Sequence, residues 1–165
     1  MPRDLKFLKS DLSKIIEGAI TTQMLQEFGT LMRDIIYKRV KAGKGVSVEK
    51  KVGGGNSNTT LKDLSPAYIK YRSKKDLGPF ASARRSNLTF SGELLESIIV
   101  KITGRTVKVE IEDVGHSNFK GGMRKLADKL AKEGRPFFGM SDTEVKILDN
   151  FVRRKIRERI RELNK

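Results

Sequence analysis

The stretch GRPFFGMSDTE, Gly134 to Glu144, places two adjacent phenylalanines directly before the start of a helix. The proline in front of Phe137 and Phe138 restricts the backbone that leads into them. Ser141 is followed three residues later by Glu144, which is the capping-box pattern of a helix N-terminus. The stretch therefore predicts a rigid corner that holds two aromatic rings at a defined angle to the last helix of the chain.

The helix that follows the corner is predicted to be amphipathic. Met140 before the cap and Val145 at the fourth helical position fit a hydrophobic staple. The apolar face is expected to consist of Val145, Leu148, Phe151, Val152, Ile156, Ile160 and Leu163, opposite the basic side chains of Arg153, Arg154, Arg157 and Arg161. We interpret the cap and the staple as local structure only.

Two hypotheses fit the paired rings. Either one ring faces the core and the other faces a neighbouring subunit, or both rings belong to the core. Adjacent residues at a corner point in different directions, which suits the first hypothesis. Phe137, Phe138 and Arg135 are therefore our candidates for an oligomer or partner interface.

The first third of the chain has helical periodicity followed by a glycine-rich tract. Apolar residues recur every three or four positions from Asp11 to Val40, which predicts one long amphipathic helix. Gly18 and Gly29 would mark bends or close contacts in it. The tract 41–63 has five glycines and few large apolar residues, so we expect a mobile basic loop with a short strand near 46–48.

The middle of the chain predicts two short helices. Ser65 followed by Pro66 fits a helix start with proline at the first position. Tyr68, Tyr71 and Phe80 could stack on nucleic-acid bases, but we expect them to pack against the core. A second short helix is predicted over Glu93–Ser97, with Thr89 or Ser91 as its cap.

A β-hairpin and a further helix complete the expected fold. Val107, Val109 and Ile111 alternate with polar residues, and the sequence 103–105 fits the turn before them. A helix follows within 120–133, ending at Gly134. The fold class is therefore α+β, with a long N-terminal helix, a small antiparallel sheet, and a basic C-terminal helix, and we expect residues 1–165 to form a single domain.

Composition excludes several kinds of function. The chain has 165 residues, no cysteine and a single histidine, His116. Disulfides, thiolate metal sites and multi-histidine metal sites are excluded. No apolar run is long enough to cross a bilayer, and the N-terminus lacks the apolar segment of a signal peptide. We expect a soluble protein without a cofactor or a bound metal.

The net charge of +15 is unevenly distributed. Residues 38–85 carry thirteen basic and three acidic residues, and residues 151–165 carry seven basic and two acidic residues. Such blocks suit contact with an anionic partner such as a phosphate backbone. The candidate contact residues are Lys41, Lys44, Lys50, Lys51, Arg84, Arg85, Arg153, Arg154, Arg157 and Arg161.

Signals for catalysis are weak. The glycines of KVGGGNSN are not followed by Lys-Ser/Thr at the spacing of a phosphate-binding loop. Glu110 and Glu112 share one strand face, which is the pattern of a solvated face. His116 lies in the next loop with no nucleophile or metal ligand placed beside it. An enzyme using Glu110, Glu112 and His116 is therefore our least favoured hypothesis.

Three segments in order carry a resemblance to a known family: LSPAYIKYR (Leu64–Arg72), NLTFSGELLESI (Asn87–Ile98) and GRPFFGMSDTEVKIL (Gly134–Leu148), with a strand pair before the last of them. The chain resembles the virion-morphogenesis family of Mu-like bacteriophages and the related tail-completion proteins of long-tailed phages. The resemblance covers roughly residues 61–155.

This resemblance implies a structural protein of the virion neck, which completes the tail and joins it to the head as part of a homo-oligomeric ring. Its partners would be other neck, tail-terminator, tail-tube or head-closure proteins, and assembly would take place in the host cytoplasm. The basic residues would meet either DNA or acidic partner proteins. The alternative function is nonspecific nucleic-acid binding through the basic loop and the C-terminal helix.

Overall fold

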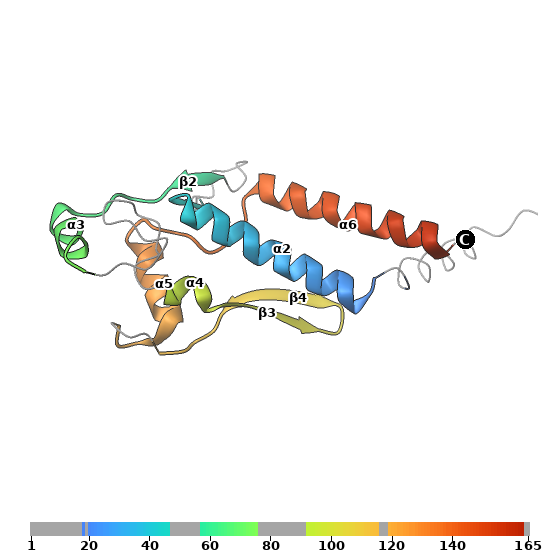
Figure 1. The fold of residues 1–165 in the computed structure, drawn as a ribbon, viewed down its shortest axis with the longest axis horizontal. Coiled ribbons are helices and arrows are strands. Elements are labelled where there is room, and N and C mark those ends of the chain that lie inside the picture. Colours follow the sequence, from blue (N-terminus) through green and yellow to red (C-terminus); the bar gives the residue numbers. More distant parts are fainter. Residues whose placement is uncertain (1–17, 19, 47–56, 76–91, 116–118, 164–165) are drawn as a thin grey trace, which may run out of the picture.

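The computed structural model describes residues 18, 20–46, 57–75, 92–115 and 119–163 of the chain. The fold is α+β, as predicted, and it is elongated (Figure 1). Its elements are α2 (Thr22–Lys41), β1 (Lys44–Val46), β2 (Asn58–Thr60), α3 (Pro66–Arg72), α4 (Glu93–Glu96), β3 (Ile98–Thr103), β4 (Thr106–Ile111), α5 (Gly122–Lys132) and α6 (Asp142–Leu163). The strands form two separate antiparallel pairs, β1 with β2 and β3 with β4.

Helix α2 begins later than the periodicity predicts. Thr21 has extended backbone angles, with φ −97° and ψ 158°, and its hydroxyl accepts a hydrogen bond of 3.1 Å from the amide of Met24. An N-cap residue in the β region interrupts a helix at that point. The prediction of one uninterrupted helix from Asp11 is therefore wrong, although residues 1–17 and 19 lie outside the described part.

The β3–β4 hairpin packs one face against α2. The register pairs Val100 with Val109 and Ile102 with Val107, which places the predicted apolar alternation on one side. A Cβ atom added at Gly29 of α2 would overlap Val100 and would lie 3.0 Å from a methyl carbon of Val107. The predicted close contact at Gly29 is confirmed, because only glycine lets the helix approach the hairpin this closely.

Replacing Gly29 with alanine should destabilise the protein despite the better helix propensity of alanine. The added methyl group must displace the valines beneath it, and overpacking of this kind costs about 1–3 kcal/mol. Urea unfolding followed by circular dichroism measures the change. Gly115→Ala is the matched control, since a Cβ atom at Gly115 meets nothing within 4 Å. Equal stability of the two variants would contradict the close contact.

The glycine-rich tract is anchored at both ends. β1 and β2 lie on either side of residues 47–56, which are outside the described part, and pair Lys44 with Thr60. A strand occurs at Lys44–Val46, whereas residues 47–48 of the strand predicted near 46–48 lie outside the described residues. The Val46 amide also donates to the carbonyl of Pro136 at 2.8 Å. Leu61 and Leu64 are buried directly after β2, so the end of the predicted mobile loop belongs to the core.

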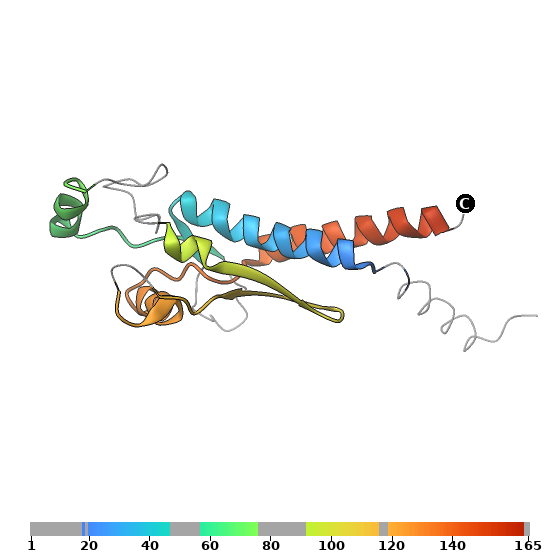
Figure 2. The same ribbon diagram turned by 60° about the horizontal axis from the view of Figure 1, so that its bottom comes forward.

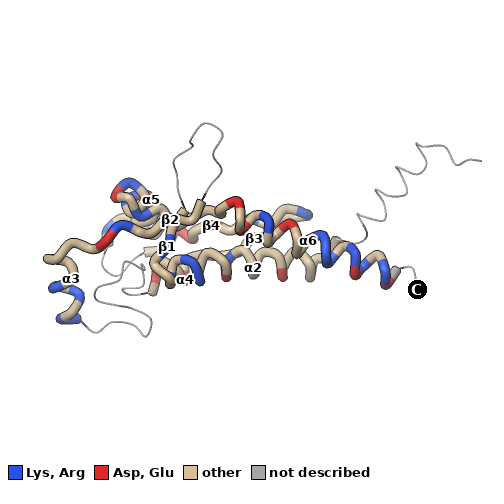
Figure 3. The backbone as a smooth tube through the Cα atoms, turned by 90° about the horizontal axis from the view of Figure 1, so that it is seen from above, with Lys and Arg blue, Asp and Glu red and all other residues tan. Residues whose placement is uncertain are grey.

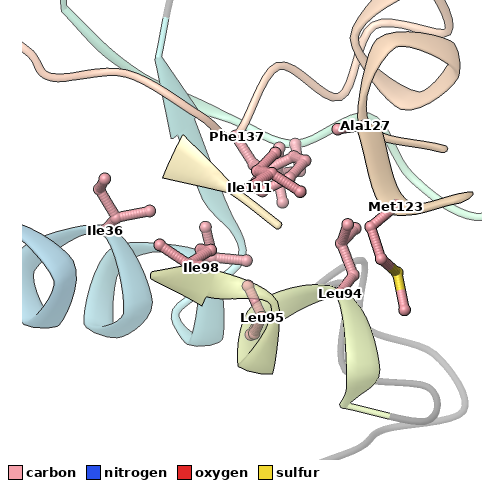
Figure 4. Close-up of a cluster of buried hydrophobic side chains, with 10 residues drawn as sticks. Ile36, Leu94, Leu95, Ile98, Ile111, Met123, Ala127 and Phe137 are labelled. Atoms are coloured by element: carbon pink, nitrogen blue, oxygen red, sulfur yellow. The ribbon is translucent and has the colours of Figure 1, made fainter. Parts of the chain in front are cut away.

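One hydrophobic core joins α2, α4, β3, β4 and α5 with the segments at Leu61 and Phe137 (Figure 4). Its buried members are Ile36, Val40, Leu61, Leu94, Leu95, Ile98, Ile111, Met123, Ala127 and Phe137. The short helix α4 contributes two leucines, but its N-cap is Gly92, with φ 84° and no side-chain cap bond. The N-cap position is thus Gly92, and the predicted cap residues Thr89 and Ser91 lie outside the described residues. Gly134, with φ 82°, follows α5 in the left-handed conformation of a helix stop, as predicted.

Helix α6 runs beside α2 (Figures 1 and 2), and in the view of Figure 1 the hairpin lies on the other side of α2. The rings of Phe28 and Phe151 lie 6.3 Å apart between the two helices, and Lys155 forms a 2.7 Å ion pair with Glu27. Val145 is 51% exposed, so its predicted place on the packing face of α6 is wrong. Glu144 points inward in its place, which rotates the packing face of α6 away from Val145.

Candidate functional site

A buried arginine of α2 holds the corner formed by residues 134–144. Arg39 is 5% exposed, and its guanidinium donates to the carbonyl of Phe137 at 2.7 Å and to that of Gly139 at 2.9 Å. The same guanidinium forms a buried ion pair with Glu144. Burial lowers the pKa of Arg39, and the neighbouring Glu144 carboxylate opposes that shift. One side chain therefore ties α2 to both sides of the corner.

The predicted capping box is confirmed, and it has a second role. The Ser141 amide donates to Glu144 Oε2 at 2.8 Å, and the Glu144 amide lies 3.4 Å from Ser141 Oγ. The oxygen of Glu144 that receives the Ser141 amide is also the partner of Arg39. The interpretation of this cap as local structure only is therefore wrong, because it also makes a tertiary contact.

Arg39 was not among the residues singled out from the sequence, although a signal for it exists. The arginine lies between Ile36 and Val40 on the apolar face of α2, where a solvated cation is out of place. A charged residue on a buried face requires an oppositely charged partner elsewhere in the fold. The sequence does not identify that partner, because it lies 105 residues away.

Arg135 connects the corner to the segment between β2 and α3. Its guanidinium donates to the carbonyl of Lys62 at 3.2 Å and to that of Asp63 at 3.1 Å, and it lies 3.3 Å from a carboxylate oxygen of Glu133. The side chain is 15% exposed. Arg135 thus supports the corner from within the chain, and its predicted role at an interface stays a prediction.

The two phenylalanines point in different directions. Phe137 is 1% exposed and belongs to the core, whereas Phe138 is 39% exposed. Their ring centroids lie 6.3 Å apart, with an angle of 71° between the ring planes. The hypothesis that both rings belong to the core is wrong. The contact of Phe138 with a neighbouring subunit stays a prediction.

Replacing Arg39 with methionine should destabilise the protein far more than removing the cap hydroxyl. The variant leaves the Glu144 carboxylate buried without its cation, which costs about 3–5 kcal/mol. Ser141→Ala removes one cap bond and should cost about 1 kcal/mol. Chemical denaturation at neutral pH measures both changes. Similar losses for the two variants would show that the contact between Arg39 and the corner is not the main tie.

The predicted anionic-contact residues near the glycine-rich tract are only partly described. Lys50, Lys51, Arg84 and Arg85 lie outside the described residues. Lys44 is exposed on β1. Lys41 at the end of α2 is half-buried, and its ammonium lies 4.3 Å from the centroid of the Tyr37 ring, a cation–π contact.

The four predicted arginines of α6 are all exposed, and basic residues recur along the helix (Figure 3). Arg153 forms a 2.7 Å ion pair with Asp149, which raises the pKa of Arg153, and Arg154 lies 3.8 Å from Glu158. Within the part of the chain that the structure describes, Arg157 and Arg161 have no ion-pair partner. These two are therefore the best placed to meet an anionic partner.

Helix α3 stands at one end of the molecule, beyond the core (Figure 1). Ser65 caps it and Pro66 opens it, as predicted. Tyr68 and Tyr71 are both exposed and stack on each other with ring centroids 6.0 Å apart. The expectation that these tyrosines pack against the core is therefore wrong, because α3 extends past the elements that could cover them. Phe80 lies outside the described residues.

The residues considered for catalysis do not come together in the described part of the chain. Glu110 forms an ion pair with Lys101, which lowers the pKa of its carboxyl, and Arg124 lies 3.9 Å away. Glu112 is exposed, and His116 is outside the described residues. No cluster of metal-ligating side chains occurs among the residues described, and none of their helices could cross a membrane.

Comparisons with protein-family models, with curated proteins and with solved structures found no match to this chain.

Proposed function

We propose that the chain is a non-enzymatic structural protein of a bacteriophage neck, which completes the tail and joins it to the head as part of an oligomeric ring. The proposal starts from the ordered resemblance over residues 61–155. The segments at Asn87–Ile98 and Gly134–Leu148 carry most of that resemblance.

The proposal is supported by the fact that these two segments pack together in one core. Leu94, Leu95 and Ile98 of the first segment belong to the same buried cluster as Phe137 of the second. The motif residues thus contribute to a scaffold, and they include no nucleophile paired with a base. Among the exposed large apolar side chains of these segments is the ring of Phe138, which is 39% exposed beside the buried corner. A rigidly held exposed aromatic residue suits a protein–protein contact.

Nonspecific nucleic-acid binding is the second candidate. Arg157 and Arg161, without ion-pair partners in the described chain, favour it together with the net charge of +15. Binding of this kind weakens steeply as salt concentration rises, because counterions are released from the phosphates. Titration of duplex DNA at several salt concentrations tests it. A flat salt response, or absence of binding, removes this candidate.

Deletion of the gene from the phage that encodes the chain tests the neck assignment. We expect lysates to contain full heads and finished tails that are not joined, visible by negative-stain electron microscopy. Supplying the wild-type protein in trans should restore joined particles. Normal numbers of joined particles in the deletion lysate would overturn the proposal.

The two phenylalanines should separate folding from assembly. Phe137→Ala empties part of the core and should cost about 3–5 kcal/mol of folding free energy. Phe138→Ala should leave the unfolding free energy within about 1 kcal/mol of wild type, because the ring is exposed. The same Phe138→Ala variant should fail to complement the deletion. Full complementation by this variant would exclude Phe138 from the assembly contact.

A further inference from the structure

The β3–β4 hairpin has open strand edges. It is a two-stranded sheet with α2 against one face, and no third strand joins it among the residues that the structure describes. Isolated two-stranded sheets are marginally stable, and an unpaired edge is a template for a further strand.

The register decides which backbone groups of β4 point outward. Thr103 pairs with Thr106 around a two-residue turn, so this pair exchanges hydrogen bonds, and every second pair after it does the same. The 2.8 Å bond from the Glu112 amide to the Ser97 carbonyl continues this series. Val107 and Val109 fall between the bonded pairs. Their amide and carbonyl groups are therefore directed away from β3.

Ile111 is the next residue whose backbone groups should point away from β3, and its carbonyl does bind a group on that side. The guanidinium of Arg124 donates to the Ile111 carbonyl at 2.9 Å from the open side of β4. In the described part of the chain, no hydrogen bond from outside the hairpin reaches Val107 or Val109. Within the described chain, the backbone groups of Val107 and Val109 are thus available for pairing.

The charges of β4 are self-complementary in one antiparallel register. When a second copy of β4 pairs through the outward groups, a twofold axis near the middle of the strand passes through Lys108, Val109 or Glu110. The first and third choices place Lys108 opposite Lys108 or Glu110 opposite Glu110, which is unfavourable. An axis at Val109 places Lys108 of each copy opposite Glu110 of the other.

The same register relieves a like-charge contact within the hairpin. Lys101 and Lys108 are directly opposite each other in the β3–β4 pair, and Glu110 already forms an ion pair with Lys101. A carboxylate from a second copy would lie on the other side of Lys108. On the face toward α2, Val109 would meet Val109 and Val107 would meet Ile111, so the apolar face would continue across both hairpins. In this register Arg124 releases the Ile111 carbonyl, which then accepts the Val107 amide of the other copy.

We propose that two copies of this chain pair through the free edge of β4, antiparallel and centred on Val109, to form a four-stranded sheet. The pairing is a closed twofold contact, so it produces a dimer. It does not rest on the proposed neck function, because it uses neither Phe138 nor the corner. A ring would use a different surface of the chain.

Charge reversal at the edge tests the pairing. Sedimentation velocity over a range of concentrations should show a dimer for the wild-type protein. Lys108→Glu and Glu110→Lys should each weaken the dimer at least about tenfold, because each creates two like-charge contacts. The double variant restores opposite charges and should dimerise again. An equimolar mixture of the two single variants should form a heterodimer, since one then carries two acidic and the other two basic residues.

Lys146→Glu is the matched control, because it makes the same charge change at an exposed position of α6. Circular dichroism spectra of all variants should match wild type. A monomeric wild-type protein at high micromolar concentration would overturn the proposal. A dimer or larger oligomer that Lys108→Glu weakens no more than Lys146→Glu, or a mixture without heterodimer, would also overturn it, whatever the outcome of the phage deletion.

Discussion

The buried contact between Arg39 and the corner is the interaction on which the rest of this structure depends. A guanidinium offers several donors in one plane, and here they reach the carbonyls of Phe137 and Gly139 and the carboxylate of Glu144. A buried charge is stabilised when it is paired and hydrogen-bonded, as both terminal nitrogens of Arg39 are, although its Nε has no partner among the described residues. The three acceptors must therefore keep their positions, which determines where α6 starts relative to α2.

The other contacts of the corner follow from this constraint. With the corner held against α2, the Pro136 carbonyl accepts the Val46 amide, and Arg135 reaches the carbonyls of Lys62 and Asp63. Three parts of the chain thus meet at the corner: β1, the segment after β2, and the capped start of α6. Phe137 then enters the core while Phe138 remains outside. The division of the two rings is a consequence of this arrangement, and it leaves one aromatic side chain for a partner.

The sequence was most informative where a structure depends on neighbouring residues. The capping box of Ser141 and Glu144, the helix start at Ser65, the stop at Gly134 and the hairpin with its alternating valines were all predicted correctly. Apart from the uninterrupted helix from Asp11, which is broken at Thr21, the predictions that were wrong concern the environment of a side chain. Tyr68 is exposed because α3 extends past the core. The local sequence does not indicate the position of a helix relative to the rest of the fold.

The sequence by itself determined the α+β class, most helix and strand positions, and the rigid turn that ends in a capped helix, because short-range hydrogen bonding and hydrophobic periodicity encode them. Only the tertiary structure decided that Glu144 replaces Val145 on the inner face of α6. It also decided that Phe137 and Phe138 separate, and that β4 keeps an open edge. The first two outcomes depend on Arg39, whose partners lie about a hundred residues further along the chain. The third depends on the absence of a third strand beside β4 among the described residues.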